Sequence, residues 1–166
     1  MRSVLKYAPV LLLMFCLTVC VCTGVESSME SMSDSDTSTA NDAARDLKFA
    51  EILTTRAVPA IFEASAALDT AFYYGNPGTL AKMSGDKSIE LTQVASLVRG
   101  VNISSECEPI REEFLSRMNS LISEVKAASS LKQGCSSCVA DIKRIHDHSV
   151  SLGIWTIERI SEISRE

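Results

Sequence analysis

The sequence predicts an all-α fold, an up-and-down bundle of four helices (five if Pro59 breaks the first), after a signal peptide and a disordered acidic leader. Apolar residues recur at steps of three and four from residue 47 onward, which is the spacing of one face of an α-helix. No stretch alternates apolar and polar residues over the length of a strand. Short connections containing Gly or Pro separate the periodic stretches, and short connections favour antiparallel neighbours.

Residues 1–24 have the form of a secretory signal peptide. Two basic residues precede an uninterrupted apolar run, Ala8 to Cys22, of about 15 residues, whereas a membrane-spanning helix needs about 20. We expect cleavage between Cys20 and Gly24, with the bond after Gly24 as the first choice. The protein is therefore expected to be secreted and extracellular, and a retained signal anchor is the alternative.

The charge of the remaining chain argues against two classes of partner. Loss of residues 1–24 removes two basic residues, so the net charge changes from −5 to about −7 on a chain of about 140 residues, enough for one domain with its own core. An acidic chain without a long basic cluster argues against binding nucleic acid. Amphipathic helices without a basic face argue against membrane association.

Residues 25–41, VESSMESMSDSDTSTAN, are predicted to be the disordered acidic leader. Almost all of its residues are acidic, hydroxyl-bearing or small, so the segment cannot bury enough apolar surface to offset the entropy cost of ordering it. The helical bundle domain is expected over residues 42–166.

The first helix is predicted to begin at Asn41 or Asp42 and to end at Gly75. Pro59 lacks a backbone donor and its ring clashes with the carbonyl of Thr55, so we expect a kink or a break there. Small residues at 66, 67 and 71 would let a neighbouring helix come close. The apolar face of this helix consists of Leu47, Ala50, Leu53, Ala57, Ile61, Ala64, Leu68 and Ala71.

Three further helices are predicted over residues 86–100, 105–134 and 136–166. Asp86 is the expected cap of the second, and Ser105 with Glu108 has the spacing of a capping box for the third. Gly153 is expected to weaken the fourth helix by about 1 kcal/mol relative to alanine. The buried stripes are expected to include Leu91, Val94 and Val98; Ile110, Phe114, Met118, Leu121, Val125 and Ala128; and Val139, Ile142, Ile145, Leu152, Ile157, Ile160 and Ile163.

The linker between the second and third helices carries one modification signal. Asn102, Ile103 and Ser104 form an N-glycosylation sequon in a chain that is predicted to be secreted. A linker between two helices is expected to be exposed. We therefore expect Asn102 to be glycosylated in a host that carries out N-glycosylation.

Cys107, Cys135 and Cys138 follow the predicted cleavage site. A continuous third helix over residues 109–131 is about 33 Å long, and the connection from it to Cys135 reaches at most about 14 Å. Because a disulfide needs its Cα atoms within about 7 Å, Cys107 cannot reach the other two unless this helix breaks. We therefore expect a local disulfide between Cys135 and Cys138, with Cys107 as a thiol, as the bridge of a homodimer, or as a partner of Cys22 if cleavage occurs after Cys20.

The stretch CSSCVADIKRIHDH holds residue types of a zinc site, in the order Cys135, Cys138, His146 and His148. On one helix, Cys138 and His146 are about 12 Å apart along the axis, and the two histidines point about 200° apart. Zinc ligands must all lie within about 2 Å of one point, so we expect no metal site. Both histidines are expected on a solvated helix face.

No motif of a known cofactor or hydrolase site occurs: there is no G-x-S-x-G, no glycine-rich phosphate loop and no H-E-x-x-H. The C-x-x-C pair at a helix start is the one candidate for enzyme chemistry, because a helix N-terminus stabilises a thiolate. No strand precedes it, as one does in thiol oxidoreductases. We therefore expect a non-enzymatic protein without a cofactor.

Two aromatic sites are candidates for contact with a ligand or partner, with core packing as the alternative. Phe72, Tyr73 and Tyr74 end the first helix beside a tight turn, and Trp155 lies among isoleucines of the fourth. The predicted function is extracellular protein recognition or carriage of a small apolar ligand. The alternative is a thiol–disulfide oxidoreductase that uses the C-x-x-C pair.

Overall fold

The structure is a computed structural model, and it describes residues 34–76, 78–132 and 135–165, with side chains described from residue 40 onward. The predicted signal peptide and residues 25–33 of the predicted leader lie outside the described residues. No strand occurs among the residues described. The elements are α2 (Asp34–Ile52), the π-helical turn η2 (Leu53–Ala57), α3 (Val58–Tyr74), α4 (Thr79–Arg99), α5 (Glu108–Ala127), the 3₁₀ turn η3 (Ala128–Ser130) and α6 (Ser136–Ile163).

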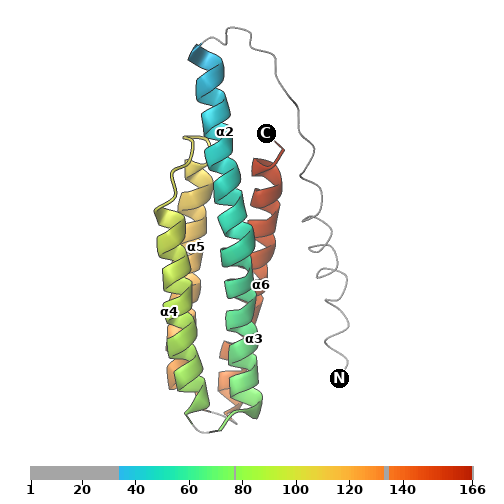
Figure 1. The fold of residues 1–166 in the computed structure, drawn as a ribbon. Helices are drawn as coiled ribbons and strands as arrows, with labels where there is room; N and C mark the ends of the chain where they lie inside the picture. The colour runs from blue at the N-terminus through green and yellow to red at the C-terminus, as the bar shows by residue number, and fades with distance from the viewer. Residues whose placement is uncertain (1–33, 77, 133–134, 166) are drawn as a thin grey trace, which may run out of the picture. The chain divides into compact units, whose positions relative to one another are not determined.

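The helices form an up-and-down bundle, as predicted (Figure 1). α2, η2 and α3 follow one another as one long rod, and α4, α5 and α6 then alternate in direction. α3 packs against α4 on one side and α6 on the other, and α5 completes the bundle by packing against α4 and α6. The rod begins at Asp34, ahead of the predicted start at Asn41 or Asp42.

Pro59 does not separate the rod into two helices, because the turn before it is wider than an α-helical turn. Over Leu53–Ala57 the helix is π-helical, and the amide of Val58 donates to the carbonyl of Leu53, five residues back. The hydroxyl of Thr55 donates to the carbonyl of Glu51 at 2.8 Å. A π-turn contains one residue more than an α-helical turn, so its hydrogen bonds join residues five apart. This change in the bonding pattern occurs just where the Pro59 ring would clash with a carbonyl of a regular α-helix.

α4 begins at Thr79, well before the predicted cap at Asp86. Gly78 has a φ of 90°, in the left-handed region that glycine adopts without a steric cost, so the chain turns tightly and the helix starts at once. Leu80 in the first turn is buried in the core. The predicted start is too late because the prediction begins the buried stripe of this helix at Leu91.

The connection between α4 and α5 is held by a hydrogen bond to α2 and by another within the connection itself. The backbone amide of Ser104 donates to Asp46 Oδ1 at 2.8 Å, and the amide of Cys107 donates to Ser104 Oγ at 3.3 Å. α5 begins at Glu108 without a side-chain cap, so the predicted capping box does not form. Asn102 is exposed on this connection, and its glycosylation stays a prediction.

The core supports most of the predicted helix faces, but Leu47 and Val139 are exposed, and Val94, Ile110, Ile157 and Ile160 are only partly buried. Gly153, predicted as a weak point of the last helix, has a packing role instead. A Cβ at this position would lie 2.5 Å from the Cζ atom of Phe62, so the glycine lets that ring of α3 rest against α6. The largest fully buried side chains are Phe49, Leu53, Ile61, Leu68, Leu91, Val98, Phe114, Met118, Leu121, Val125, Ile142 and Leu152.

Candidate functional site

Most of the predicted site residues meet at one end of the bundle. α3 ends, α4 begins and α6 begins at this end, which lies at the bottom of Figure 1. It therefore carries the aromatic residues 72–74 together with Cys135 and Cys138, although more than 60 residues separate the two groups in the chain. Cys107 and Asn102 lie at the opposite end, on the connection between α4 and α5.

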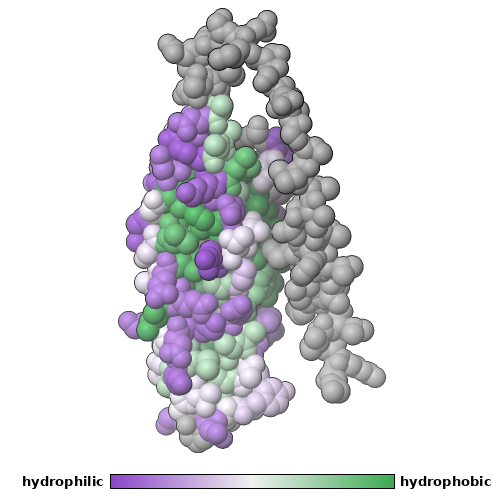
Figure 2. Space-filling view, viewed as in Figure 1, coloured by the Kyte–Doolittle hydropathy of each residue, from purple (hydrophilic) through white to green (hydrophobic). Residues whose placement is uncertain are grey.

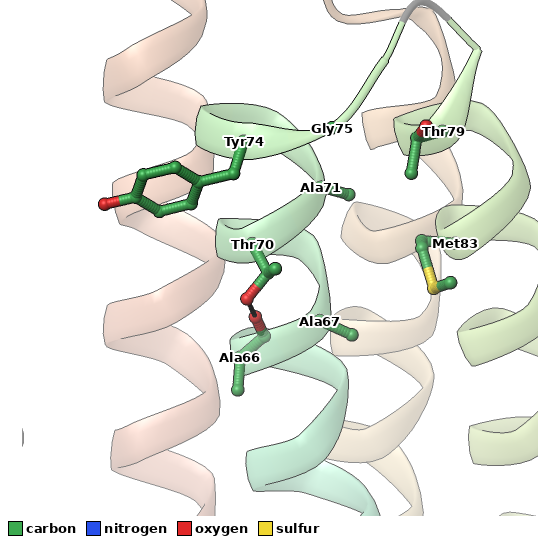
Figure 3. A pocket seen from close by; sticks show the side chains of 8 residues that line it. All are labelled: Ala66, Ala67, Thr70, Ala71, Tyr74, Gly75, Thr79 and Met83. Carbon is green, nitrogen blue, oxygen red and sulfur yellow. Dashed lines mark hydrogen bonds between the residues drawn. The ribbon is translucent and has the colours of Figure 1, made fainter.

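A hollow of about 400 Å³, the α3–α4 pocket, opens between the two helices at this end. In Figure 3, Ala67 and Ala71 of α3 point toward Thr79 and Met83 of α4, and the ring of Tyr74 projects from the last turn of α3. The methyl groups of the alanines are too short to fill the space between the helices. The lining residues are Ala66, Ala67, Thr70, Ala71, Tyr74, Gly75, Thr79 and Met83.

A second hollow of about 470 Å³, the Pro59 hollow, lies farther along the same two helices. Two of its lining residues, Glu63 and Glu90, form ion pairs with Lys87, whose Nζ atom lies 2.7 Å from Glu90 and 3.4 Å from Glu63 across the helix interface. The hydrogen bond to Glu90 is the main reason that the pKa of Lys87 is raised. The lining residues are Thr55, Arg56, Pro59, Ala60, Glu63, Glu90, Gln93, Val94 and Leu97.

The two hollows differ in chemistry. Charged side chains line the Pro59 hollow, whereas no charged residue lines the α3–α4 pocket. Figure 2 shows strongly hydrophobic side chains in the upper half of the viewed face and side chains of intermediate hydropathy toward the lower end, where α3 and α4 are joined. The α3–α4 pocket is therefore the better fit for an apolar group of a ligand or partner.

The three aromatic residues that end α3 have different environments. Phe72 is only 4% exposed and belongs to the core, with its ring edge-on to Tyr73 at 5.1 Å between centroids. Tyr73 is 53% exposed and Tyr74 is 87% exposed. Of the three predicted contact residues, the two tyrosines are accessible to a partner, and Tyr74 also lines the α3–α4 pocket.

Trp155, the other predicted contact residue, is partly buried in the C-terminal half of α6. The guanidinium of Arg117 lies 4.9 Å from the ring centroid and that of Arg159 lies 5.8 Å from it. Cation–π contacts of this kind hold the indole against the bundle. Trp155 lines neither of the two hollows.

Cys135 and Cys138 are thiols in the structure, at the start of α6. Cys135 is partly exposed, and its Sγ lies 3.0 Å from Ser137 Oγ. The pKa of Cys135 is lowered to about 7, first by a hydrogen bond with the thiol of Cys138 and then by the one with Ser137. The disulfide between Cys135 and Cys138 stays a prediction.

Cys107 lies buried at the start of α5, only 3% exposed, so a bridge to a second copy needs local opening of this helix end. α5 is continuous over Glu108–Ala127. Its two ends are therefore about 30 Å apart, which keeps Cys107 out of reach of Cys135.

The two histidines connect α6 to its neighbours, so the expectation of a solvated face was wrong. His148 Nδ1 lies 3.1 Å from Glu124 of α5. His146 Nδ1 lies 3.0 Å from Ser65 Oγ and 3.2 Å from Asp69 Oδ2, both on α3. Because Ser65 and Asp69 are four residues apart, the sequence already places them on one face of the helix. That His146 is their shared partner follows only from the packing of α3 on α6.

The group of Ser65, His146 and Asp69 does not have the arrangement of a catalytic triad. In a triad, the hydroxyl and the carboxylate bind opposite nitrogens of the imidazole, whereas here both contact Nδ1. Burial raises the pKa of Asp69, and His146 opposes this increase in part. The group holds two helices together and offers no relay for a proton.

No protein family, curated protein or solved structure matches the chain. Among the described residues, no helix has the length and apolar character needed to cross a membrane. In the same part of the chain, no three His, Cys, Asp or Glu side chains come together as metal ligands would.

Proposed function

We propose that this is a secreted, non-enzymatic helical protein that recognises another extracellular protein through the α3–α4 pocket. The observation that carries the proposal is an uncharged hollow of about 400 Å³ with the exposed ring of Tyr74 at its edge. Pockets of this size are large enough for an apolar group, and tyrosine is enriched among the residues that dominate binding energy at protein interfaces. Glycosylation of Asn102 at the opposite end would leave the pocket accessible.

Recognition of a protein is favoured over carriage of a small apolar ligand inside the bundle. The space between the four helices is filled by large side chains such as Phe114, Met118 and Leu152, all fully buried. The α3–α4 pocket lies instead between two helices at the surface and is open to solvent. A protruding side chain of a partner can enter such a site without opening the core.

Selection of random peptides displayed on phage against the immobilised secreted chain tests the proposal. We expect the selected peptides to share a large apolar or aromatic residue. Their affinity should fall by about tenfold or more with Tyr74→Ala, which removes the ring, and with Ala67→Leu, which fills the hollow. Ile154→Ala, at an exposed apolar residue of α6, is the matched control and should leave the affinity unchanged.

Selected peptides that bind equally well to the Tyr74 and Ala67 variants would contradict the proposal. Native mass spectrometry of the gently isolated protein separates the carriage alternative. A copurifying small molecule that is lost from Ala67→Leu would assign the pocket to a carried ligand instead of a protein.

A thiol–disulfide oxidoreductase is the second candidate function. It is favoured by one observation, the partly exposed thiol of Cys135 in contact with the buried thiol of Cys138. Such a pair suits an attacking and a resolving cysteine. An oxidoreductase must accelerate the reduction of insulin by dithiothreitol and lose this activity in Cys135→Ser, whereas a binding protein shows no acceleration.

A further inference from the structure

The two cysteines of α6 differ in their access to solvent. Cys135 occupies the position just before the first turn and is partly exposed. Cys138 is 8% exposed and belongs to the hydrophobic core. The amide of Cys138 donates to the carbonyl of Cys135 at 3.1 Å, which closes the first turn and holds the two residues together. A reagent from solvent therefore reaches Cys135 first.

The surroundings of Cys135 favour its thiolate. The Cys138 thiol and the Ser137 hydroxyl both contact its sulfur, and together they lower its pKa to about 7. The backbone amides at the N-terminus of α6 add to this stabilisation. A larger share of Cys135 side chains is therefore in the thiolate form at neutral pH than for an ordinary cysteine.

We propose that Cys135 is the site of exchange with a low-molecular-weight disulfide, and that Cys138 resolves the mixed disulfide into an intrachain one. The inference goes beyond the binding function and needs no catalytic turnover.

The reaction balances in two steps. The Cys135 thiolate attacks one sulfur of the disulfide RSSR, forms the mixed disulfide and expels RS⁻, which takes up the proton that Cys135 lost. The Cys138 thiol then gives up its proton and attacks Cys135 Sγ, and the second RS⁻ leaves and takes that proton. Two protein thiols are oxidised to one disulfide while RSSR is reduced to two RSH.

Cys107 provides an internal reference for selectivity. It lies at the opposite end of the bundle and is buried beside the connection between α4 and α5. The same reagent therefore meets one accessible, thiolate-rich cysteine and one shielded cysteine in a single folded chain. Modification should begin at Cys135 and leave Cys107 unchanged while the bundle is folded.

Oxidised glutathione is the probe, and intact-mass spectrometry with peptide mapping is the measurement. The secreted chain, first reduced, should form the Cys135–Cys138 disulfide through a short-lived adduct of one glutathione. Cys138→Ser and Cys138→Ala should accumulate this adduct at Cys135, and Cys135→Ser should not react at the same rate. Two replacements at position 138 guard against a variant that fails to fold.

The rate at pH 7 should exceed that of a short peptide of residues 132–141 by about fivefold, because the gain in thiolate is partly offset by lower nucleophilicity. Ser137→Ala should lower the rate at pH 7 without changing the far-ultraviolet circular dichroism. An adduct that forms first at Cys107, or no adduct in either Cys138 variant, would overturn the inference. Absence of insulin reduction would exclude only the oxidoreductase candidate, because that assay requires repeated turnover.

Discussion

α3 packs against two neighbouring helices in two different ways. Against α6, the ring of Phe62 rests on Gly153, and Ser65 and Asp69 contact His146. Against α4, the contact is interrupted by two hollows, with the ion pairs of Lys87 beside them. One helix therefore has a closed interface on one side and an open interface on the other.

Side-chain size accounts for the difference. A ring can fill the space between two helices when the opposite residue is a glycine, as at Gly153. Along the lower part of α4, the α3 side of the interface consists mainly of alanines, and their methyl groups leave the space empty. The interface with α6 is filled by side chains, whereas the interface with α4 keeps unfilled space.

Gly153→Ala, in the closed interface, should have the largest effect on stability. The new methyl group would lie 2.5 Å from Phe62 Cζ, so the ring must move and the closed interface must open. We expect the free energy of unfolding to fall by about 1–2 kcal/mol in urea denaturation, as for other overpacked sites. Gly85→Ala is the matched control, because a Cβ there meets no atom within 4 Å.

The control should behave in the opposite way. Gly85→Ala should raise the free energy of unfolding by about 1 kcal/mol, the gain in helix propensity. In a Phe62→Ala background, Gly153→Ala should become stabilising as well. If Gly153→Ala remains equally destabilising without the Phe62 ring, the contact is not the reason for the glycine.

Asp69 makes the closed interface sensitive to pH. Burial raises the pKa of Asp69 above 3.8 in the folded protein. The stabilising contribution of Asp69 is therefore complete below the pKa that it has in the unfolded chain, and it is lost as the pH rises through its pKa in the folded protein. The unfolding free energy of the wild type, relative to Asp69→Asn, should therefore decrease between about pH 3 and pH 7. We expect less than about 1 kcal/mol, because the carboxylate is 35% exposed.

A carboxyl-carbon NMR titration tests the cause directly. His146 is the group that lowers the pKa of Asp69, in opposition to burial. His146→Gln should therefore raise the pKa of Asp69 further above that of the wild type. An unchanged or lower pKa in this variant would show that the histidine does not act on the carboxylate.

Lys87→Met tests the ion pairs of the open interface. Lys87 bridges Glu90 of its own helix and Glu63 of α3, and both carboxylates are well exposed. We expect a loss of about 0.5 kcal/mol at low salt that becomes smaller as salt is added. Lys82→Met, at an exposed lysine of the same helix, is the control. A loss that does not change with salt would mean that packing of the lysine stem is responsible.

Ala67→Leu should have the smallest effect on stability. The added carbons enter the α3–α4 pocket instead of a filled core, so we expect the free energy of unfolding to change by less than about 0.5 kcal/mol. Thermal and urea denaturation measure it. A loss as large as that of Gly153→Ala would mean that the two interfaces of α3 are equally closed.

The sequence alone predicted an all-α bundle, the range of the last helix and most of the buried stripes. These are local properties, because a helix face repeats every 3.6 residues and can be recognised within one segment. The early start of α4 was missed, since only a short apolar group, Leu80, Ala81 and Met83, precedes Gly85. At Pro59 the sequence predicted a disturbance but not its form, a π-turn that directly precedes the proline-containing helix.

The candidate site could be predicted only in part. Tyr73 and Tyr74 were identified from an aromatic cluster at a helix end, and both are exposed. The alanines of α3 were expected to let a helix come close, and α4 does pack against α3 there, with Ala71 buried. The hollow that Ala67 and Ala71 also line was not foreseen, because the space left between two helices depends on the side chains along their whole contact.

The sequence by itself determined where helices form, since hydrophobic periodicity, proline and glycine act through neighbouring residues. The tertiary structure decided which faces meet. The partners Ser65 and His146 are 81 residues apart, and the ring of Phe62 lies against a glycine of another helix. Those pairings arise from the volumes and charges of two packed surfaces together, so neither segment determines them alone.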